Sequence, residues 1–265
     1  MSTDKQYKYT HATDNLLLMK TIREIVEGYD GPLLHKWSNY IDIYDSHFSK
    51  YRGQEIVFLE IGISHGGSLK LWREYFGPQA KIYAIDIDPD CKKFETANTK
   101  IFTGSQEDVE FLKKVKKELP PIDILLDDGG HTMRQQIVTF NVMFDHVKEN
   151  GIYACEDTHT SYFPEYGGGL KKSKTFIEFC KNHIDELHGW YALSKDEKAM
   201  KTKITSSVWG IHFYDSIVLY IKKRIEKPYA IYKGHETVDR QKFIDYGHKQ
   251  PFYKFVTNLL SGRKK

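Results

Sequence analysis

The chain has 265 residues, of which 40% are hydrophobic, and its 15 Phe, 18 Tyr and 4 Trp are enough to form a sizeable core. This composition excludes an intrinsically disordered chain and fits one globular domain with additions. The three cysteines form no CxxC pair, which argues against a disulfide framework or a thiolate zinc site and favours a reducing compartment. No apolar run reaches the length of a membrane span, so we expect a cytosolic protein without a transmembrane segment.

The net charge is small, at +3, but it is unevenly distributed. Residues 222–265 contain twelve Lys or Arg and four Asp or Glu, which gives this tail a charge of +8 and leaves −5 for the rest of the chain. We interpret residues 223–265 as a solvated basic extension and expect no nucleic-acid partner. Apolar residues at helical spacing in residues 252–260 suit docking on the body of the protein or on a second subunit, and we expect a homo-oligomer.

Residues 1–54 are predicted to form a helical segment that covers one face or edge of a sheet. Asp14 is suited to cap a helix over residues 15–27, which Gly28 would end. A second helix is predicted over residues 33–50, because Trp37, Ile41, Tyr44 and Phe48 recur at spacings of three and four.

From residue 55 onward, short apolar runs alternate with amphipathic helical patterns, which is typical of a doubly wound, mostly parallel sheet. Strands are predicted over residues 56–61, 81–85, around 101, 122–126 and 152–155, and helices over residues 68–76, 89–96, 106–117 and 133–147. Two β-rich runs in residues 208–221, with a turn at residues 215–216, predict a C-terminal antiparallel hairpin. We therefore expect an α/β, Rossmann-like sheet of seven strands over residues 55–222, with a lid or insert at about residues 158–206 that includes a helix over residues 173–187.

A glycine-rich loop follows the first predicted strand, in the sequence Glu-Ile-Gly-Ile-Ser-His-Gly-Gly-Ser of residues 60–68. It lacks the GxGxxG spacing that brings a dinucleotide pyrophosphate close to the backbone, because Ser64 replaces the second glycine. A carboxylate at the start of such a turn better suits S-adenosylmethionine, which carries a sulfonium, an amino group and a carboxylate. The predicted cofactor residues in this loop are Glu60, Gly62, Ser64, His65, Gly66 and Ser68.

The next strand ends in acidic residues that suit the ribose of the same cofactor. Asp86 is placed where a carboxylate accepts hydrogen bonds from both ribose hydroxyls, and Asp88 follows it. After the third strand, Gly104, Ser105, Gln106 and Asp108 either meet the adenine edge or cap the following helix. Asp127, at the end of the fourth strand, is predicted to face the cofactor cleft.

Two neighbouring strand ends carry acidic pairs, Asp127 with Asp128 and Glu156 with Asp157. Neighbouring parallel strands deliver their carboxyl ends to one crevice, where four like charges repel one another unless a cation neutralises them. Asp128, Glu156 and Asp157, with waters and substrate oxygens, would form the all-oxygen shell that Mg²⁺ prefers, and Mn²⁺ is an acceptable substitute.

His131 lies three residues after Asp128, at the start of the next predicted helix. A neutral imidazole there can remove a proton from a hydroxyl that a metal polarises, so His131 is the predicted general base and Asp128 its catalytic partner. His159 is the second choice for the base, and it is equally suited to orient Glu156 or to contact substrate. Tyr162 and Tyr166 belong to an adjoining glycine-rich loop that is suited to close over a sugar.

The motifs at residues 60–68, 83–89, 127–132, 156–162 and 211–216 together resemble those of class I S-adenosylmethionine-dependent methyltransferases. The narrower resemblance, over about residues 59–221, is to the Mg²⁺-dependent sugar O-methyltransferases of macrolide (mycinamicin) type and to related surface-glycan methyltransferases. It implies a metal on Asp128, Glu156 and Asp157, a base at His131, and a sugar or glycan acceptor. A surface-glycan acceptor would place the protein in polysaccharide biosynthesis.

Three other functions are compatible with parts of this pattern. A catechol-type O-methyltransferase would use the same fold and Mg²⁺ on a different acceptor. A non-haem iron hydroxylase would use His131, His159 and one carboxylate as a facial triad, but it has no use for the glycine-rich loop. A glycan-binding protein without enzymatic activity would have no need of four converging carboxylates.

Overall fold

The computed structural model describes residues 19–192, 201–235 and 237. Residues 1–227 form one compact unit and residues 228–265 a second, and the described residues of the second unit form no helix or strand. Asp14 and the apolar residues 252–260 lie outside the described residues. Within the described ranges, no helix is both long enough and apolar enough to cross a membrane.

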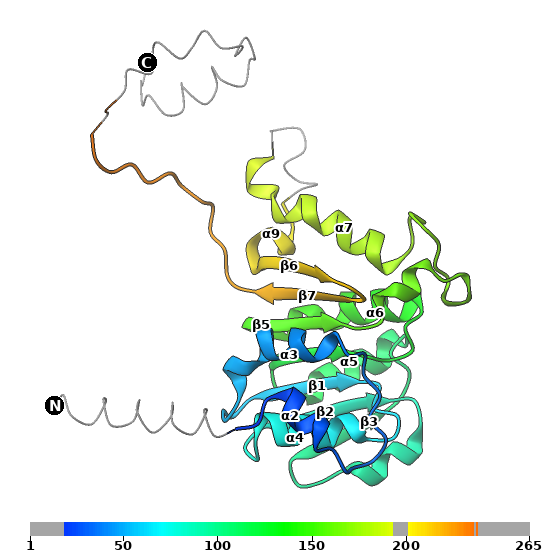
Figure 1. Ribbon diagram of the computed structural model, residues 1–265. Coiled ribbons are helices and arrows are strands. Elements are labelled where there is room, and N and C mark those ends of the chain that lie inside the picture. The colour runs from blue at the N-terminus through cyan, green and yellow to red at the C-terminus, as the bar shows by residue number, and fades with distance from the viewer. Residues whose placement is uncertain (1–18, 193–200, 236, 238–265) are drawn as a thin grey trace, which may run out of the picture. The chain divides into compact units, whose positions relative to one another are not determined.

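A seven-stranded sheet forms the centre of the first unit (Figure 1). Its strands are ordered β3-β2-β1-β4-β5-β7-β6, and only β7 runs antiparallel to the others. This topology confirms the predicted Rossmann-like fold and its C-terminal hairpin. The strands are β1 (Val57–Ile61), β2 (Lys81–Asp86), β3 (Thr99–Thr103), β4 (Ile122–Asp127), β5 (Val147–Cys155), β6 (Val208–Tyr214) and β7 (Ile217–Lys222).

Helices cover both faces of the sheet, because each face contributes one set of apolar side chains to a separate core cluster. One face packs against α2 (Ile22–Glu27), α3 (Tyr40–Phe48) and α4 (Gly67–Phe76). The opposite face packs against α5 (Val109–Glu118), α6 (Met133–Met143) and α7 (Phe176–Leu187), and a short helix, α9 (Lys203–Ser207), precedes β6.

The N-terminal helices begin later than the sequence predicted. Helix α2 begins at Ile22, because Thr21 and Glu24 form a capping box there. Helix α3 begins at Tyr40, so the prediction of a helix from residue 33 was wrong. Residues 33–37 have no regular secondary structure in the described chain, and they run beside the glycine-rich loop, where the Leu33 carbonyl leaves no room for a Cβ at Gly67.

Two further differences concern short helices. The segment Pro89–Phe94 is a 3-10 helix rather than an α-helix, with Asp88 accepting a hydrogen bond from the Asp90 amide at its start. Helix α9 was not predicted, because five residues are too few for a periodic pattern to be visible.

The register of the parallel strands brings four loops to one edge. Ile61 at the end of β1 is aligned with Ile85 in β2 and with Asp127 in β4, and Asp127 is aligned with Cys155 in β5. The residues that leave these strands therefore emerge side by side, at the edge where open α/β sheets bind ligands.

Candidate active site

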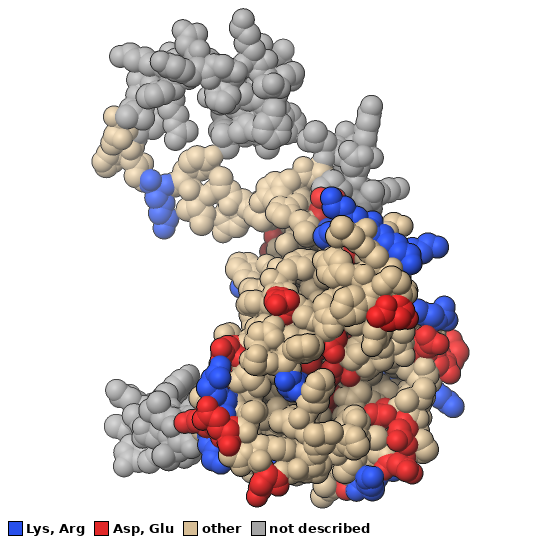
Figure 2. Space-filling view, turned by 45° about the vertical axis from the view of Figure 1, so that its right-hand side comes forward, with Lys and Arg blue, Asp and Glu red and all other residues tan. Residues whose placement is uncertain are grey.

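A cavity of about 470 Å³ lies at this edge, within the usual size range of small-molecule sites. Six chain segments line it: residues 33–37, 61–65, 85–88, 104–106, 128–131 and 156–157, together with Ser68 and Gln135. Most of the residues predicted to bind cofactor or metal thus share one cavity. In Figure 2 a few acidic side chains lie within a largely uncharged surface near the middle of the molecule.

Left-handed backbone conformations and hydrogen bonds to Asp86 determine the conformation of the glycine-rich loop. Gly62 has a φ of +84°, and a Cβ there would lie 2.2 Å from the Asp128 carbonyl oxygen, so only glycine fits. Asp86 accepts hydrogen bonds at one oxygen from the amides of Ile63 (2.8 Å) and Ser64 (3.0 Å). The carboxylate thus shapes the loop while still lining the cavity.

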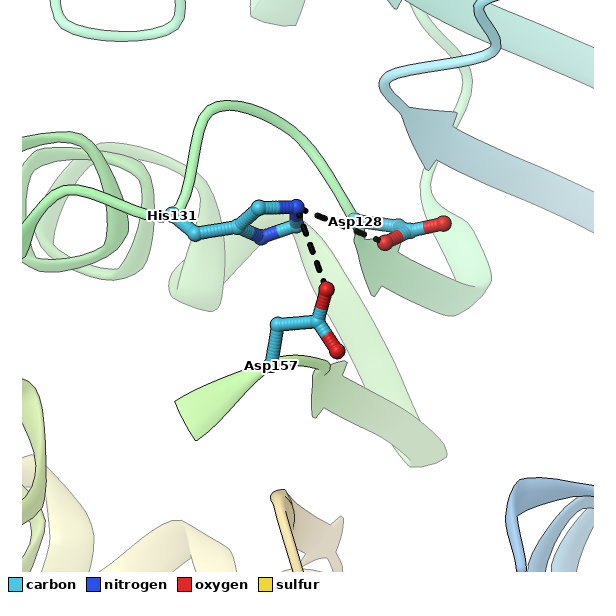
Figure 3. Close-up of side chains that lie close together, drawn as sticks. All are labelled: Asp128, His131 and Asp157. Carbon is cyan, nitrogen blue, oxygen red and sulfur yellow. Dashed lines mark ion pairs between the residues drawn. The ribbon is translucent and has the colours of Figure 1, made fainter. Parts of the chain in front are cut away.

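Three of the functional candidates form a cluster that we call the outer cluster, Asp128, His131 and Asp157 (Figure 3). One ligand atom of each lies within 4.8 Å of the others. His131 Nε2 is 3.3 Å from Asp157 Oδ2 and 3.9 Å from Asp128 Oδ1, and each side chain is about one-fifth exposed. His131 and Asp157 both have positive φ values, 58° and 52°, an unfavourable conformation that occurs preferentially at functional sites.

Behind the outer cluster lies a second group, the inner network, formed by Lys36, Tyr44, Glu60 and Glu156. The Lys36 ammonium lies 2.5 Å from Asp128 Oδ2, 2.9 Å from Glu156 Oε1 and 3.6 Å from Glu60 Oε1. The Tyr44 hydroxyl donates to Glu156, whereas Glu60 accepts from Ser68 and Trp72. All four side chains are almost fully buried.

Burial shapes the electrostatics of the inner network. Burial and the neighbouring Asp128 charge raise the pKa of Glu156 well above its usual range, and Lys36 only partly opposes this. Burial lowers the pKa of Lys36, but Asp128, Glu156 and Glu60 outweigh that effect and raise it, so the lysine is a cation. Burial also raises the pKa of Glu60 to about 7. Both carboxyl shifts disfavour the negative charge, so a positive charge close to these carboxylates is favourable.

Curated relatives of this chain are sugar O-methyltransferases. A tetracenomycin-C rhamnosyl 3'-O-methyltransferase from Streptomyces olivaceus is 35% identical over 200 residues, which are 71% of this chain and 50% of that protein. The L-olivosyl-oleandolide 3-O-methyltransferase from Streptomyces antibioticus is 34% identical over 211 residues, which are 76% of this chain and 53% of that protein. No protein-family model matches the chain.

Among solved structures, the MycE methyltransferase of the mycinamycin biosynthetic pathway, in complex with Mg and SAH, superposes with a TM-score of 0.71. It is 30% identical, over 78% of this chain and 55% of that one. This chain belongs to the class I S-adenosylmethionine-dependent methyltransferases. It spans about half the length of the curated methyltransferases that it matches.

Four of the predicted cofactor residues do not line the cavity: Glu60, Gly66, Asp108 and Asp127. Asp108 caps α5 by accepting from the amides of Glu110 and Phe111, so the capping alternative describes its contacts. Asp127 is buried and accepts from the Gln106 side chain at 2.8 Å. Gly62, Ser64, His65, Ser68, Asp86, Asp88, Gly104, Ser105 and Gln106 do line it.

The predicted metal residues divide between the two groups. Asp128 and Asp157 belong to the outer cluster, whereas both carboxylate oxygens of Glu156 contact the Lys36 ammonium. The donor set of the outer cluster, two carboxylates and one imidazole, fits a divalent cation.

Helix α3 supplies residues that the sequence did not reveal as functional. Tyr40 donates to Asp157 at 2.7 Å and Tyr44 donates to Glu156, so one helix supports both members of the acidic pair. Lys36 lies in the irregular segment before this helix, so no helical spacing connects it with the two tyrosines. The sequence pattern included Tyr44 only as part of an apolar helix face, and both tyrosine rings are indeed buried.

The predicted substrate residues, His159, Tyr162 and Tyr166, do not line the cavity. The His159 ring contacts Trp37 and Phe163 edge to face, with ring centroids 5.9 Å and 5.4 Å apart, and its Nδ1 is bonded to the Ser216 hydroxyl. Trp37, Tyr162 and Phe163 are about half exposed. Tyr166 belongs to a short 3-10 helix within the predicted lid.

Proposed function

We propose that the chain is an O-methyltransferase that transfers the methyl group of S-adenosylmethionine to a sugar hydroxyl with the help of a divalent cation. The observation that carries this proposal is that the outer cluster and the glycine-rich loop open into the same cavity. A methyl donor in the loop and a hydroxyl at the cluster would therefore lie next to each other, and such alignment supplies much of the rate of a bimolecular transfer.

Asp128 and Asp157 would hold Mg²⁺, or Mn²⁺ in its place, and Glu156 would complete the set if its contacts with Lys36 opened. When bound, Mg²⁺ supplies Lewis acidity toward a hydroxyl oxygen. The outer cluster suits this ion, since its side chains are partly exposed and converge from two strand ends.

His131 would remove the proton of the acceptor hydroxyl at Nε2. This atom faces Asp157 and Asp128, whose negative charges stabilise the imidazolium that forms. Its Nδ1 is buried and has no hydrogen-bond partner among the described residues. Asp86 and the loop residues around Gly62 would bind the methyl donor.

A sugar ring is the acceptor that the surroundings of the cluster support. Trp37 lines the cavity, and the His159 ring contacts both Trp37 and Phe163. Both of these rings are about half exposed, and such rings pack on the apolar face of a sugar. The related enzymes act on sugars attached to tetracenomycin and oleandolide. A glycan of a surface polysaccharide, a cytosolic location and a homo-oligomeric state are further parts of the proposal that rest on the sequence alone.

Calorimetric titration tests the cofactor and metal parts of the proposal separately. S-adenosylmethionine is titrated into the wild type with Mg²⁺ and with excess EDTA, and into Asp86→Ala and Asp128→Ala. We expect binding that survives EDTA and Asp128→Ala but is lost in Asp86→Ala. The absence of binding to the wild type under every condition would contradict the proposed methyl transfer.

The acceptor is tested by incubating the protein with S-adenosylmethionine, Mg²⁺ and a panel of rhamnosides and catechols. Mass spectrometry then detects the added methyl group. Methylation of a rhamnoside but of no catechol would support the sugar, whereas the reverse would favour a catechol-type enzyme.

A further inference from the structure

The proposed mechanism has no use for Lys36. Its side chain is 4% exposed, and its ammonium touches carboxylates from three different segments, Glu60, Asp128 and Glu156. It comes from residues 33–37, which also form one wall of the cavity. A lone lysine before a helix gives no hint of this role in the sequence.

Burying an ammonium is unfavourable unless carboxylates pair with it closely. Lys36 satisfies this condition by engaging Asp128 Oδ2 at 2.5 Å and both oxygens of Glu156, at 2.9 and 3.2 Å. These are two of the three carboxylates that the sequence assigned to the metal. The Lys36 ammonium thus contacts carboxylate oxygens that a divalent cation would need as ligands.

Asp128 connects the two positions, since its second oxygen, Oδ1, faces His131 in the outer cluster. A cation bound to Asp128 and Asp157 would lie within a few ångströms of the Lys36 ammonium, and the two positive charges would repel each other. Full coordination by Glu156 would require the ammonium to leave it. Glu60, 3.6 Å from the ammonium, is the carboxylate that could retain it.

We propose that Lys36 is a positioning residue that competes with the divalent cation for Asp128 and Glu156, and so sets the cation concentration at which the site fills. The inference rests on the proposed metal-dependent function. Without the cation, Lys36 keeps the carboxylates together; with the cation, the ammonium moves toward Glu60. Because Lys36 belongs to the cavity wall, loading of the cation is coupled to the shape of the cofactor site.

The test is the affinity for Mn²⁺, which is measured from the decrease of the free Mn²⁺ signal in electron paramagnetic resonance. Lys36→Met keeps the length and the apolar stem of the side chain but removes the charge. We expect Lys36→Met to bind Mn²⁺ at least about tenfold more tightly than the wild type, since a unit charge a few ångströms away in a partly buried site has a large effect. A purely structural role would instead weaken binding.

Lys20→Met is the matched control, because Lys20 pairs with Glu74 at the exposed surface and its loss changes the net charge equally. Its Mn²⁺ affinity should equal that of the wild type. If Lys36→Met does not fold, Lys36→Gln tests the same loss of charge with a hydrogen-bond donor retained. A second readout is the melting temperature: Mg²⁺ should raise it more in Lys36→Met than in the wild type.

Unchanged or weaker Mn²⁺ binding in folded Lys36→Met would overturn the inference, while the proposed function would stand if the wild type binds Mn²⁺ and transfers methyl groups. If neither protein binds Mn²⁺, both the inference and the metal-dependent function fail. If Lys36→Met binds Mn²⁺ and the wild type does not, the result would support the proposed competition between Lys36 and the cation.

Discussion

The inner network and the outer cluster each take one carboxylate from the end of β5, Glu156 and Asp157, yet these two adjacent residues differ in burial and in partners. The Glu156 side chain is 2% exposed and has a lysine and a tyrosine as partners, whereas Asp157, the next residue, is 19% exposed and faces a histidine. A buried carboxylate requires partners within the protein, while a partly exposed one can exchange water for a ligand. The inner network therefore depends on contacts within the protein, whereas the outer cluster is open to a ligand, as the proposed function requires.

His131→Gln would separate the two groups most strongly. This change removes the base but leaves every residue of the inner network in place. We expect the rate of methyl transfer to fall by about 10²- to 10⁴-fold, the usual contribution of a general base, while binding of S-adenosylhomocysteine stays unchanged. The rate is measured by mass spectrometry of the methylated acceptor, and binding by calorimetry.

His159→Gln is the comparison variant, because His159 is the alternative base and pairs with Ser216. A loss of rate in His159→Gln that equals or exceeds the loss in His131→Gln would assign the base to His159 instead.

Tyr40→Phe and Tyr44→Phe form a matched pair, because each removes one hydroxyl from the same helix face. Tyr40 supports Asp157 in the outer cluster, so its loss should weaken Mn²⁺ binding by about 10- to 100-fold, as for other groups that orient metal ligands. Tyr44 supports Glu156 in the inner network, so its loss should instead lower the free energy of unfolding by roughly 1–3 kcal/mol.

Both properties are measured in both variants, by Mn²⁺ titration and by urea unfolding with EDTA present. Equal losses of affinity in the two variants would show that the inner network and the outer cluster act as one unit, and would remove the distinction drawn above.

The outer cluster could be predicted from the sequence because strands and their ends are local features. Two apolar runs define both the strands and the edge of the sheet at which they end. One run stops on Asp127 and Asp128, and the other stops on Glu156 and Asp157. The parallel register then brings the pairs together without any further information. The sequence assigned Asp128, Glu156 and Asp157 to the metal, but it gave no sign that Glu156 contacts Lys36.

The inner network could not be predicted because its contacts are distant in sequence. Lys36 contacts Asp128 and Glu156, which are 92 and 120 residues away in the sequence. No local sequence pattern indicates that this lysine is buried in the folded protein. The helical spacing of residues 33–50 also misled us, since the apolar periodicity continued into a segment that the cavity holds in an irregular conformation. Tertiary contacts with Gly67 and the carboxylates outweighed local propensity there.

Asp127 offers the smallest but cleanest test of the comparison, because it is a buried carboxylate without a cation. It accepts hydrogen bonds from Gln106 and, at 3.4 Å, from Tyr153, and burial raises its pKa to about 7. The unfolded chain releases this proton near pH 4, so between about pH 4 and 7 the native state binds more protons and the free energy of unfolding falls as pH rises.

Asp127→Asn keeps the shape and removes the titration. We expect the free energy of unfolding, measured in urea at several pH values, to decline less in the variant between pH 4 and 7, which leaves it about 1–2 kcal/mol more stable relative to the wild type at pH 8 than at pH 4. Asp90→Asn, at an exposed position, should leave the pH dependence unchanged. If the free energy of unfolding had the same pH dependence in Asp127→Asn and the wild type, burial would not raise the pKa of this carboxyl. That result would contradict the difference drawn here between buried and partly exposed carboxylates.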